Sequence, residues 1–232
     1  MSTNPFKNKN VLITAGPTQE AIDPVRYISN HSSGKMGYAI AEAFLNEGAN
    51  VYLISGPASI KLESPDLEIV SVRTANEMYE ACCLYFEQAD IVIFSAAVAD
   101  YRPEKIALQK IKKNSDSFSI KMIKNIDIAY ELGRIKKSHQ LTVGFALETN
   151  QELQHAIGKL NKKNLDMVVL NSMNDQNATF EYDTNKITII KPNILPKKFS
   201  LKHKTEVAQD IIKEIALILI AKHVLNETCN LN

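Results

Sequence analysis

The sequence has few cysteines, no excess of basic residues and no long hydrophobic run, and each shortage excludes a class of protein. Lys and Arg number 27 against 26 Asp and Glu, a formal net charge of +1. A nucleic-acid-binding protein that relies on counterion release usually carries a clear basic excess, so we expect no nucleic-acid partner. The most apolar stretch, residues 215–221, is seven residues long, whereas a membrane-spanning helix needs about 20. We therefore expect no membrane partner either.

The three cysteines, Cys82, Cys83 and Cys229, form no disulfide framework and no metal-binding pattern. Their number is odd, two are adjacent, and no CxxC or His/Cys spacing occurs. The ten N-terminal residues are polar and lack the apolar core of a signal peptide. These features indicate incidental thiols in a reducing compartment and predict a cytoplasmic protein.

Short apolar runs alternate with amphipathic segments along the chain. Near-continuous apolar runs separated by helices are typical of parallel strands that are covered on both faces. The sequence therefore predicts an α/β fold with an open doubly wound, mostly parallel, Rossmann-like sheet. Strands are predicted at residues 11–15, 51–54, 69–72, 91–94, 141–145 and 167–170, and helices at 34–48, 75–88, 151–161 and 205–223.

Two stretches interrupt this alternation. Residues 99–124 are long, lysine-rich and weakly patterned, as in a lid or binding loop, and we expect a flap or arm there with an edge strand at 118–122. Residues 180–190 are typical of a small β hairpin that turns at Asp183-Thr184-Asn185. The sequence has no internal repeat and no low-complexity linker. We therefore predict one domain, residues 1–232, with a core sheet over about 11–171 and the hairpin and C-terminal helix over about 179–223.

A long polar segment, residues 16–37, follows the first predicted strand, and ligands of doubly wound sheets bind at the carboxyl ends of the strands. It ends in a Ser-Ser-Gly-Lys sequence at a helix N-terminus, which is a natural anion site. A Walker A loop is excluded, because Ser29 and Met36 occupy positions that require Gly and Ser or Thr. The GxGxxG dinucleotide fingerprint is also missing, which disfavours an NAD-dependent oxidoreductase. The predicted phosphate- or substrate-binding residues are Ser32, Ser33, Gly34 and Lys35.

Three further segments carry candidate ligand-binding residues. The sequence SAAVADYRP follows the fourth predicted strand; its small residues let a flat ligand approach the backbone, and Asp100 can accept hydrogen bonds. Lys110 begins the cationic sequence KIKK. Lys159 and Lys163, four residues apart, lie on one face of the helix that follows VGFALET. Taken alone, either group of lysines could be an ordinary solvated surface.

The motif ITAGPTQEAIDPVRYISNHSSGKMG, followed in register by AAVADYRP, KIKK and VGFALET, resembles phosphopantothenate–cysteine ligase, the ligase domain of bacterial bifunctional coenzyme A biosynthesis proteins. The resemblance runs over about residues 11–171. It implies an enzyme, unrelated to ATP-grasp ligases, that joins 4′-phosphopantothenate to L-cysteine. The carboxylate would attack the α-phosphate of CTP and release pyrophosphate. The amine of cysteine would then attack the acyl-CMP intermediate and release CMP.

The resemblance also implies cofactors, partners and site residues. It implies CTP as a substrate, with ATP left open, and Mg²⁺ held mainly by phosphates and water rather than by side chains. It also implies a homodimer. We expect no NAD, because the fingerprint is missing, and no FMN, because the flavin-dependent decarboxylase is expected to be a separate protein. By motif matching, the catalytic residues are Asn30, Lys110 and Arg26. The nucleotide-binding residues are Phe94, Ser95, Ala96, Asp100, Lys110, Ile126, Asp127, Ile128, Ala129, Phe145, Lys159 and Lys163.

Two positions depart from the family pattern. Ile126 stands where the family usually has Pro in an Asn-Pro-Asp turn, and Leu147 stands where Ala is usual. The alternative function is a catalytically silent nucleotide-binding partner of a separate decarboxylase, against which the intact Asn30, Lys110 and Asp100 argue. The chain begins about ten residues before its first predicted strand. We therefore expect the ligase to stand alone, natively or as an excised domain, with the decarboxylase a separate protein.

Overall fold

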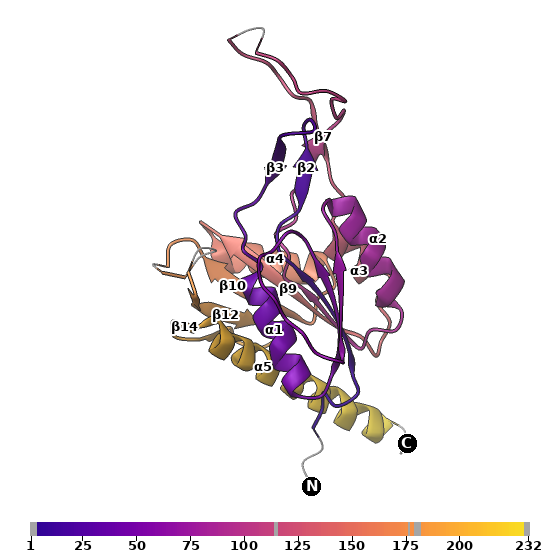
Figure 1. The fold of residues 1–232 in the computed structure, drawn as a ribbon. Coiled ribbons are helices and arrows are strands. Elements are labelled where there is room, and N and C mark those ends of the chain that lie inside the picture. Colours follow the sequence, from indigo (N-terminus) through magenta and orange to yellow (C-terminus); the bar gives the residue numbers. More distant parts are fainter. Residues whose placement is uncertain (1–3, 114–115, 176, 179–181, 230–232) are drawn as a thin grey trace.

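The computed structural model describes residues 4–113, 116–175, 177–178 and 182–229, which fold around an eight-stranded sheet with the order β13-β12-β10-β9-β6-β1-β4-β5 (Figure 1). The strands from β10 to β5 pair in parallel, and β12 and β13 extend the sheet through antiparallel pairs. The parallel strands are β1 (Asn10–Ala15), β4 (Asn50–Ser55), β5 (Leu67–Ser71), β6 (Ile91–Phe94), β9 (Leu141–Glu148) and β10 (Met167–Ser172). The remaining two are β12 (Ile187–Ile190) and β13 (Lys197–Lys198).

The strand order reverses beside β1. The chain runs from β1 outward through β4 to β5, returns to β6 on the other side of β1, and continues to β9 and β10. Ile13 of β1 lies in register with Leu53 of β4 and with Ile93 of β6. This is the doubly wound, Rossmann-like order, so the fold class expected from the sequence is confirmed. In such sheets the point of reversal is where ligands bind.

Helices bury both faces of the sheet (Figure 1). Successive side chains of a strand point to opposite faces, and β1 is buried on both: Val11 and Ile13 pack in one apolar cluster, and Leu12 packs in the other. Helices α1 (Lys35–Asn46) and α5 (Lys204–Cys229) cover the first face, and α2 (Ala75–Phe86), α3 (Ile128–Arg134) and α4 (Glu152–Lys162) cover the second. Within the described residues, no helix is long and apolar enough to cross a membrane.

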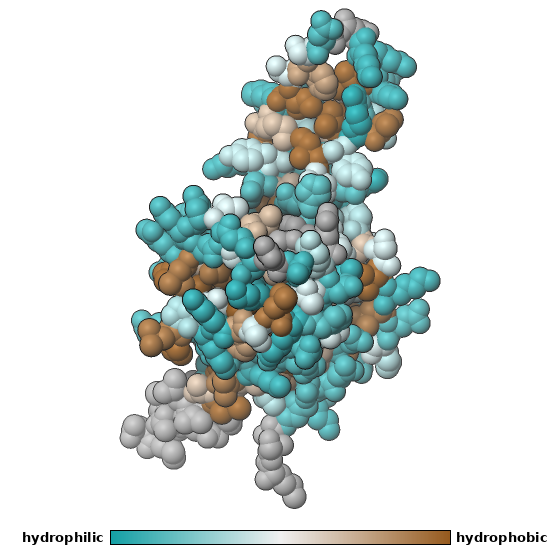
Figure 2. Space-filling view, turned by 90° about the vertical axis from the view of Figure 1, so that its left-hand side faces the viewer, coloured by the Kyte–Doolittle hydropathy of each residue, from teal (hydrophilic) through white to brown (hydrophobic). Residues whose placement is uncertain are grey.

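A projection stands out from the sheet, formed by two antiparallel strand pairs (Figure 1). The first pair is β2 (Gln19–Ala21) with β3 (Tyr27–Ser29), and the second is β7 (Tyr101–Pro103) with β8 (Met122–Lys124). The described residues between β7 and β8, 104–113 and 116–121, are called the arm below. Figure 2 shows apolar surface on the upper part of the projection. The exposed apolar side chains of the arm and of the turn between β2 and β3 are Val25, Ile106, Leu108 and Phe118.

The structure corrects two of the predicted elements. Thr184 and Asn185, expected in the turn of a hairpin, form β11 (Thr184–Asn185), which pairs with β14 (Lys202–His203). The apolar strand β12 instead joins the main sheet beside β10, where Ile187 and Ile189 become fully buried. Phe180 lies outside the described residues. The edge strand expected at 118–122 begins only at Met122, because the chain pairs there with β7.

Candidate functional site

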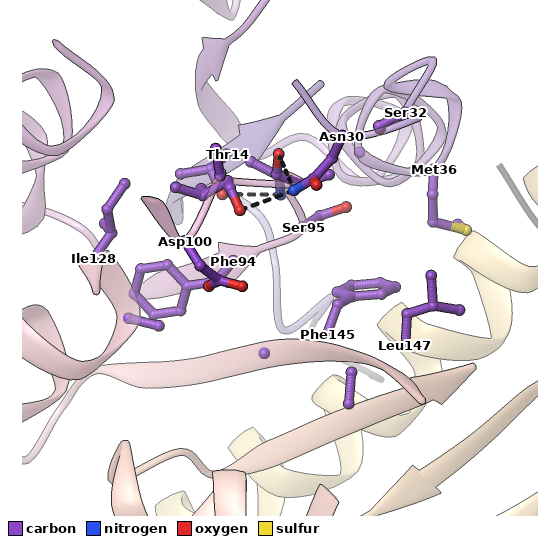
Figure 3. A pocket seen from close by; sticks show the side chains of 18 of the residues that line it. Thr14, Asn30, Ser32, Met36, Phe94, Ser95, Asp100, Ile128, Phe145 and Leu147 are labelled. Atoms are coloured by element: carbon purple, nitrogen blue, oxygen red, sulfur yellow. Dashed lines mark hydrogen bonds between the residues drawn. The ribbon is translucent and has the colours of Figure 1, made fainter. Parts of the chain in front are cut away.

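A large cavity lies at the carboxyl ends of β1, β6, β9 and β10, where the strand order reverses (Figure 3). Its volume is about 1210 Å³, above the 300–1,000 Å³ typical of a pocket for one small ligand. The cavity therefore has room for a nucleotide and a second substrate. The sheet contributes, among others, Thr14, Phe94, Phe145, Leu147 and Asn171. Other walls come from residues 29–37, 95–101 and 124–130, and from Lys159, Lys162, Lys163, Leu165, Met173, Ala178, Asn185 and Lys204.

The segment before α1 forms one wall of the cavity. It includes the predicted phosphate-binding residues Ser32, Ser33, Gly34 and Lys35. Gly34 precedes the helix with φ of 78°, and α1 has no side-chain cap, so its positive end is available to an anion. Gly37 lets this end approach the sheet, because a Cβ there would lie 2.6 Å from the Cβ of Ala15. The ammonium of Lys35 forms an ion pair with Asp183 at 2.5 Å.

Asn30 connects this wall to the segment after β6. Its side-chain Nδ2 donates hydrogen bonds to the carbonyl oxygens of Ala97 at 3.2 Å and Val98 at 3.0 Å (Figure 3). The family resemblance implies a catalytic role for Asn30, in which its amide could donate to a substrate carbonyl. In the structure both N–H groups are engaged with the backbone instead, which leaves Oδ1 as the atom that can contact a ligand.

Nine of the expected nucleotide-binding residues lie together along another wall. Phe94 is nearly buried, and Ser95, Ala96 and Asp100 follow it along the backbone. Residues 126–129 and Phe145 also line the cavity, and in Figure 3 Ile128 and Phe145 lie on opposite sides of Phe94. The sequence motifs and the geometry therefore agree on these positions. The residues brought together here are Phe94, Ser95, Ala96, Asp100, Ile126, Asp127, Ile128, Ala129 and Phe145.

Asn125 holds the two sides of this wall together, a role that sequence reasoning missed. Its side chain donates to the carbonyl of Ala99 at 2.7 Å, and its backbone N–H donates to the carbonyl of Asp100 at 2.9 Å. Asp127 caps α3 by accepting a hydrogen bond from the N–H of Tyr130. These contacts fix the turn around Ile126 without the proline that is usual in the family. The sequence signal available for this role was a polar residue, Asn125, two positions before the aspartate that caps α3.

The two predicted lysines, Lys159 in α4 and Lys163 directly after it, both line the cavity. Lys159 Nζ donates to the carbonyl of Phe145 at 3.2 Å and lies 3.8 Å from a carboxylate oxygen of Glu148. Burial, and then the neighbouring Lys163 ammonium, lower the pKa of Lys159. Lys163 forms an ion pair with Asp127 at 2.7 Å. The cavity thus contains a pair of cations that repel one another, which a polyanionic ligand would relieve.

Lys110 and Arg26 lie on the projection, outside the cavity lining. Lys110 is exposed on the arm. Arg26 follows the turn between β2 and β3 and forms an ion pair with Asp23. The structure therefore brings together most of the predicted site residues but separates these two from them.

The donors around the cavity suit a metal ion that is bound to phosphates. Among residues 4–113, 116–175, 177–178 and 182–229, no group of three His, Cys, Asp or Glu side chains is placed to hold a metal. The cavity instead offers lysines and the exposed carboxylate of Asp100. Mg²⁺ commonly binds through one or two carboxylates together with substrate phosphates. This donor set fits that mode.

The sheet topology and the lysine-lined cavity at its point of reversal define a Rossmann-like α/β protein with a cationic ligand site. Residues 6–218 match the sequence model of the family described as DNA/pantothenate metabolism flavoprotein C-terminal domain, and the chain belongs to this family. The family assignment made from the sequence motifs is confirmed.

Named relatives agree with this assignment. The chain is 50% identical over 207 residues to the Coenzyme A biosynthesis bifunctional protein CoaBC of Haemophilus influenzae, covering 89% of this chain and 51% of that protein. It is 48% identical over 219 residues to a Cysteine/Cysteine sulfinic acid decarboxylase from an unknown prokaryotic organism, covering 94% and 61%. The crystal structure of the C-terminal domain of a CoaBC protein superposes with a TM-score of 0.79 at 39% identity, covering 94% of this chain and all of that one. The chain spans about half the length of the CoaBC relatives it matches.

Proposed function

We propose that this chain is a phosphopantothenate–cysteine ligase that acts through an acyl-CMP intermediate in coenzyme A biosynthesis. The observation that carries the proposal is the cavity itself, which gathers Asn30, Asp100, Phe145, Lys159 and Lys163 from separate segments around one space. Its cationic wall suits a nucleoside triphosphate, and its volume leaves room for a second substrate. Membership of the family and the similarity to CoaBC proteins support the same reaction.

The first step brings an anionic carboxylate to a polyanionic triphosphate. The carboxylate of 4′-phosphopantothenate attacks the α-phosphorus of CTP, and the bond to the bridging oxygen breaks to release pyrophosphate. Lys159 and Lys163 lower the barrier by neutralising the charge that gathers on the phosphates. Mg²⁺ held by these phosphates, with Asp100 as a protein ligand, would supply further neutralisation. We assign CTP on the resemblance to bacterial ligases.

The second step needs no nucleophile from the protein. The neutral amine of cysteine attacks the acyl carbon of the mixed anhydride, CMP leaves with the electron pair of the C–O bond, and the amine loses a proton. Because the N–H groups of Asn30 already bind two backbone carbonyls, its Oδ1 is the atom that faces a ligand. An oxygen acceptor is suited to orient the attacking amine.

We also propose that two copies of the chain complete each site. A backbone hydrogen bond from Ala107 N–H to the carbonyl of Ile22, at 3.0 Å, ties the arm to the turn between β2 and β3. The arm is therefore poorly placed to fold over its own cavity independently. Its exposed Leu108 and Phe118 would be buried in a dimer, and Lys110 would enter the cavity of the second copy.

Coexpression of two inactive variants tests the shared site. Lys110→Ala and Lys159→Ala subunits with different tags are purified as a mixed dimer. If Lys110 acts in the second copy, one of the two sites in a mixed dimer is intact, and activity returns to about half of the wild-type value. An inactive mixed dimer would show that each chain uses its own Lys110, and a monomer by light scattering would contradict the dimer.

Trapping the intermediate tests the reaction. Incubation with CTP, Mg²⁺ and 4′-phosphopantothenate but no cysteine is expected to accumulate a species with the mass of the acyl-CMP, and added cysteine is expected to convert it to product. Tight nucleotide binding with no such species and no product would instead favour the silent nucleotide-binding partner.

A further inference from the structure

Asp23 is a buried carboxylate on a part of the molecule that is otherwise exposed. Its side chain has no exposed surface, although it begins the turn between β2 and β3, where Val25 is 59% exposed. Oδ1 accepts hydrogen bonds from the backbone N–H groups of Val25 and Arg26, both at 2.9 Å. An aspartate that bonds to the following backbone in this way forms an Asx turn. This half of the carboxylate shapes the turn.

The other half of the carboxylate reaches the arm. Oδ2 accepts a hydrogen bond from the backbone N–H of Ile111 at 3.1 Å, in addition to the bonds from the guanidinium of Arg26. Arg26 Nη2 in turn donates to the carbonyl of Ile111 at 3.2 Å. Both backbone polar groups of Ile111 are therefore held by one ion pair, 88 residues away along the chain. Ile111 directly follows Lys110.

A second contact links the same ion pair to the part of the arm that returns toward β8. The guanidinium of Arg26 lies 6.0 Å from the centre of the Phe118 ring, within the range of a cation–π contact. The guanidinium of Arg26 also keeps the pKa of Asp23 well below its usual range despite the burial. The carboxylate thus stays ionised, and keeps its hydrogen bonds to three backbone N–H groups and to the guanidinium of Arg26, throughout the pH range in which an enzyme is assayed. A turn of this kind needs the contacts of Oδ1 only, so those of Oδ2 require another explanation.

We propose that Asp23 and Arg26 are positioning residues that hold the backbone at Ile111 and thereby place Lys110 for catalysis. The inference rests on the proposed ligase function and gives Arg26 a role different from direct contact with substrate. The IDPVR and KIKK motifs then act as one unit: the first fixes the place of the second, and the ammonium of Lys110 stays free to meet the phosphates. Lys110 is the catalytic residue of this unit.

The test is Asp23→Asn, which keeps the acceptor for the turn but replaces Oδ2 by an NH₂ group that cannot accept from Ile111. The matched control is Glu104→Gln, which removes the 2.6 Å ion pair with Lys121 elsewhere on the same arm. Because a small misplacement of a catalytic group can cost roughly 100-fold, we expect kcat to fall by about this factor in Asp23→Asn. The KM for CTP is expected to change less than about threefold, because Lys159 and Lys163 are untouched. Glu104→Gln is expected to keep wild-type kcat.

Hydrogen exchange supplies a readout that is independent of activity. The amide of Ile111 is expected to exchange faster in Asp23→Asn than in wild type or Glu104→Gln, while peptides from β1 and β6 keep their protection and so report an intact sheet. Arg26→Lys, which keeps the charge but loses the forked geometry, is expected to change exchange and kcat in the same direction. If Asp23→Asn fails to fold, Arg26→Lys carries the test alone.

The possible outcomes distinguish a wrong positioning role for Asp23 and Arg26 from a wrong proposed function. Faster exchange at Ile111 with wild-type kcat would overturn the positioning role, and so would a fall in kcat with unchanged exchange. Equal kcat values for Asp23→Asn and Glu104→Gln would overturn it as well. A wild-type protein without ligase activity would instead contradict the proposed function, and the exchange measurement would still report whether the contact exists.

Discussion

The side chain of Asn30 donates a hydrogen bond to the carbonyl oxygen of Val98 at 3.0 Å, and so joins the segment before α1 to the segment after β6. Both segments line the cavity. Asn30 is itself exposed, so the contact contributes more to the shape of the site than to the stability of the fold.

This contact predicts the behaviour of Asn30→Asp. A carboxylate has no N–H to donate and would repel the carbonyls of Ala97 and Val98. We expect kcat to fall by roughly 10²-fold, while the free energy of unfolding changes by less than about 1 kcal/mol. Steady-state kinetics and urea denaturation measure the two quantities. Retention of wild-type kcat would show that these hydrogen bonds do not organise the reacting groups.

The lowered pKa of Lys159 predicts that nucleotide binding depends on pH. Burial and Lys163 lower its pKa in the free protein, and a bound triphosphate would raise it again. Below the pKa of the free protein, Lys159 is charged with or without ligand and affinity is constant. Above it, binding requires proton uptake, so affinity for CTP falls as the pH rises.

Calorimetry of Lys159→Arg provides the control for this dependence, because arginine does not deprotonate. Titrations from about pH 7 to about pH 10, in buffers with different ionisation enthalpies, are expected to show proton uptake in wild type and much less in Lys159→Arg. The same alkaline weakening in both proteins would assign the effect to another group.

Lys110→Ala is expected to keep nucleotide binding and to lose most turnover. Lys159 and Lys163, which line the cavity, are unchanged in this variant, so the affinity for CTP in the absence of the second substrate should change by less than about threefold, whereas kcat falls by roughly 10²-fold or more. Lys112→Ala removes a neighbouring exposed charge and is the matched control. Similar kcat values for the two variants would reduce KIKK to a general cationic patch.

Glu214 forms buried ion pairs far from the site, and their loss is expected to destabilise the fold. Its side chain is 5% exposed and forms ion pairs with Lys191 and Lys197, both at 2.6 Å. Burial raises the pKa of Glu214, but the two lysines outweigh it and the net pKa is lowered. The two ion pairs therefore stabilise the fold when the pH is above the unfolded-state pKa of glutamate. This stabilisation is lost as the pH falls through the folded-state pKa of Glu214.

Glu214→Gln is expected to cost about 3 kcal/mol of unfolding free energy at neutral pH, as for other buried pairs that lose one partner. The difference from wild type should shrink in acid. The exposed Glu87, paired with Lys137, offers a control in which Glu87→Gln changes stability little. Denaturation of the three proteins at neutral and acidic pH measures these differences.

The sheet was predictable because its strands bury both faces and so appear as apolar runs. Leu12 and Ile13 illustrate this, since they are fully buried on opposite sides of β1. The prediction of a hairpin around Asp183 was wrong for a physical reason. Its apolar strand buries more surface as β12, beside the already apolar β10, than it would in an isolated pair.

The cavity was predictable where motifs fall at the carboxyl ends of strands, as Asp100 and Phe145 do. The hydrogen bonds from Asp23 and Arg26 to the backbone of Ile111 were not predictable. The Asp-Pro pair in the sequence indicates a turn, but the partner of Asp23 is a backbone N–H 88 residues distant. A backbone group has no signature in the sequence. Only the folded chain reveals this contact.

The most direct test of the central claim is pyrophosphate release from CTP and Mg²⁺ with 4′-phosphopantothenate, measured with and without L-cysteine and repeated with ATP. The proposed ligase predicts release that requires phosphopantothenate, increases on addition of cysteine and is accompanied by an equal amount of CMP, with CTP preferred to ATP. Folded protein that binds nucleotide but releases no pyrophosphate with either one would contradict the ligase function.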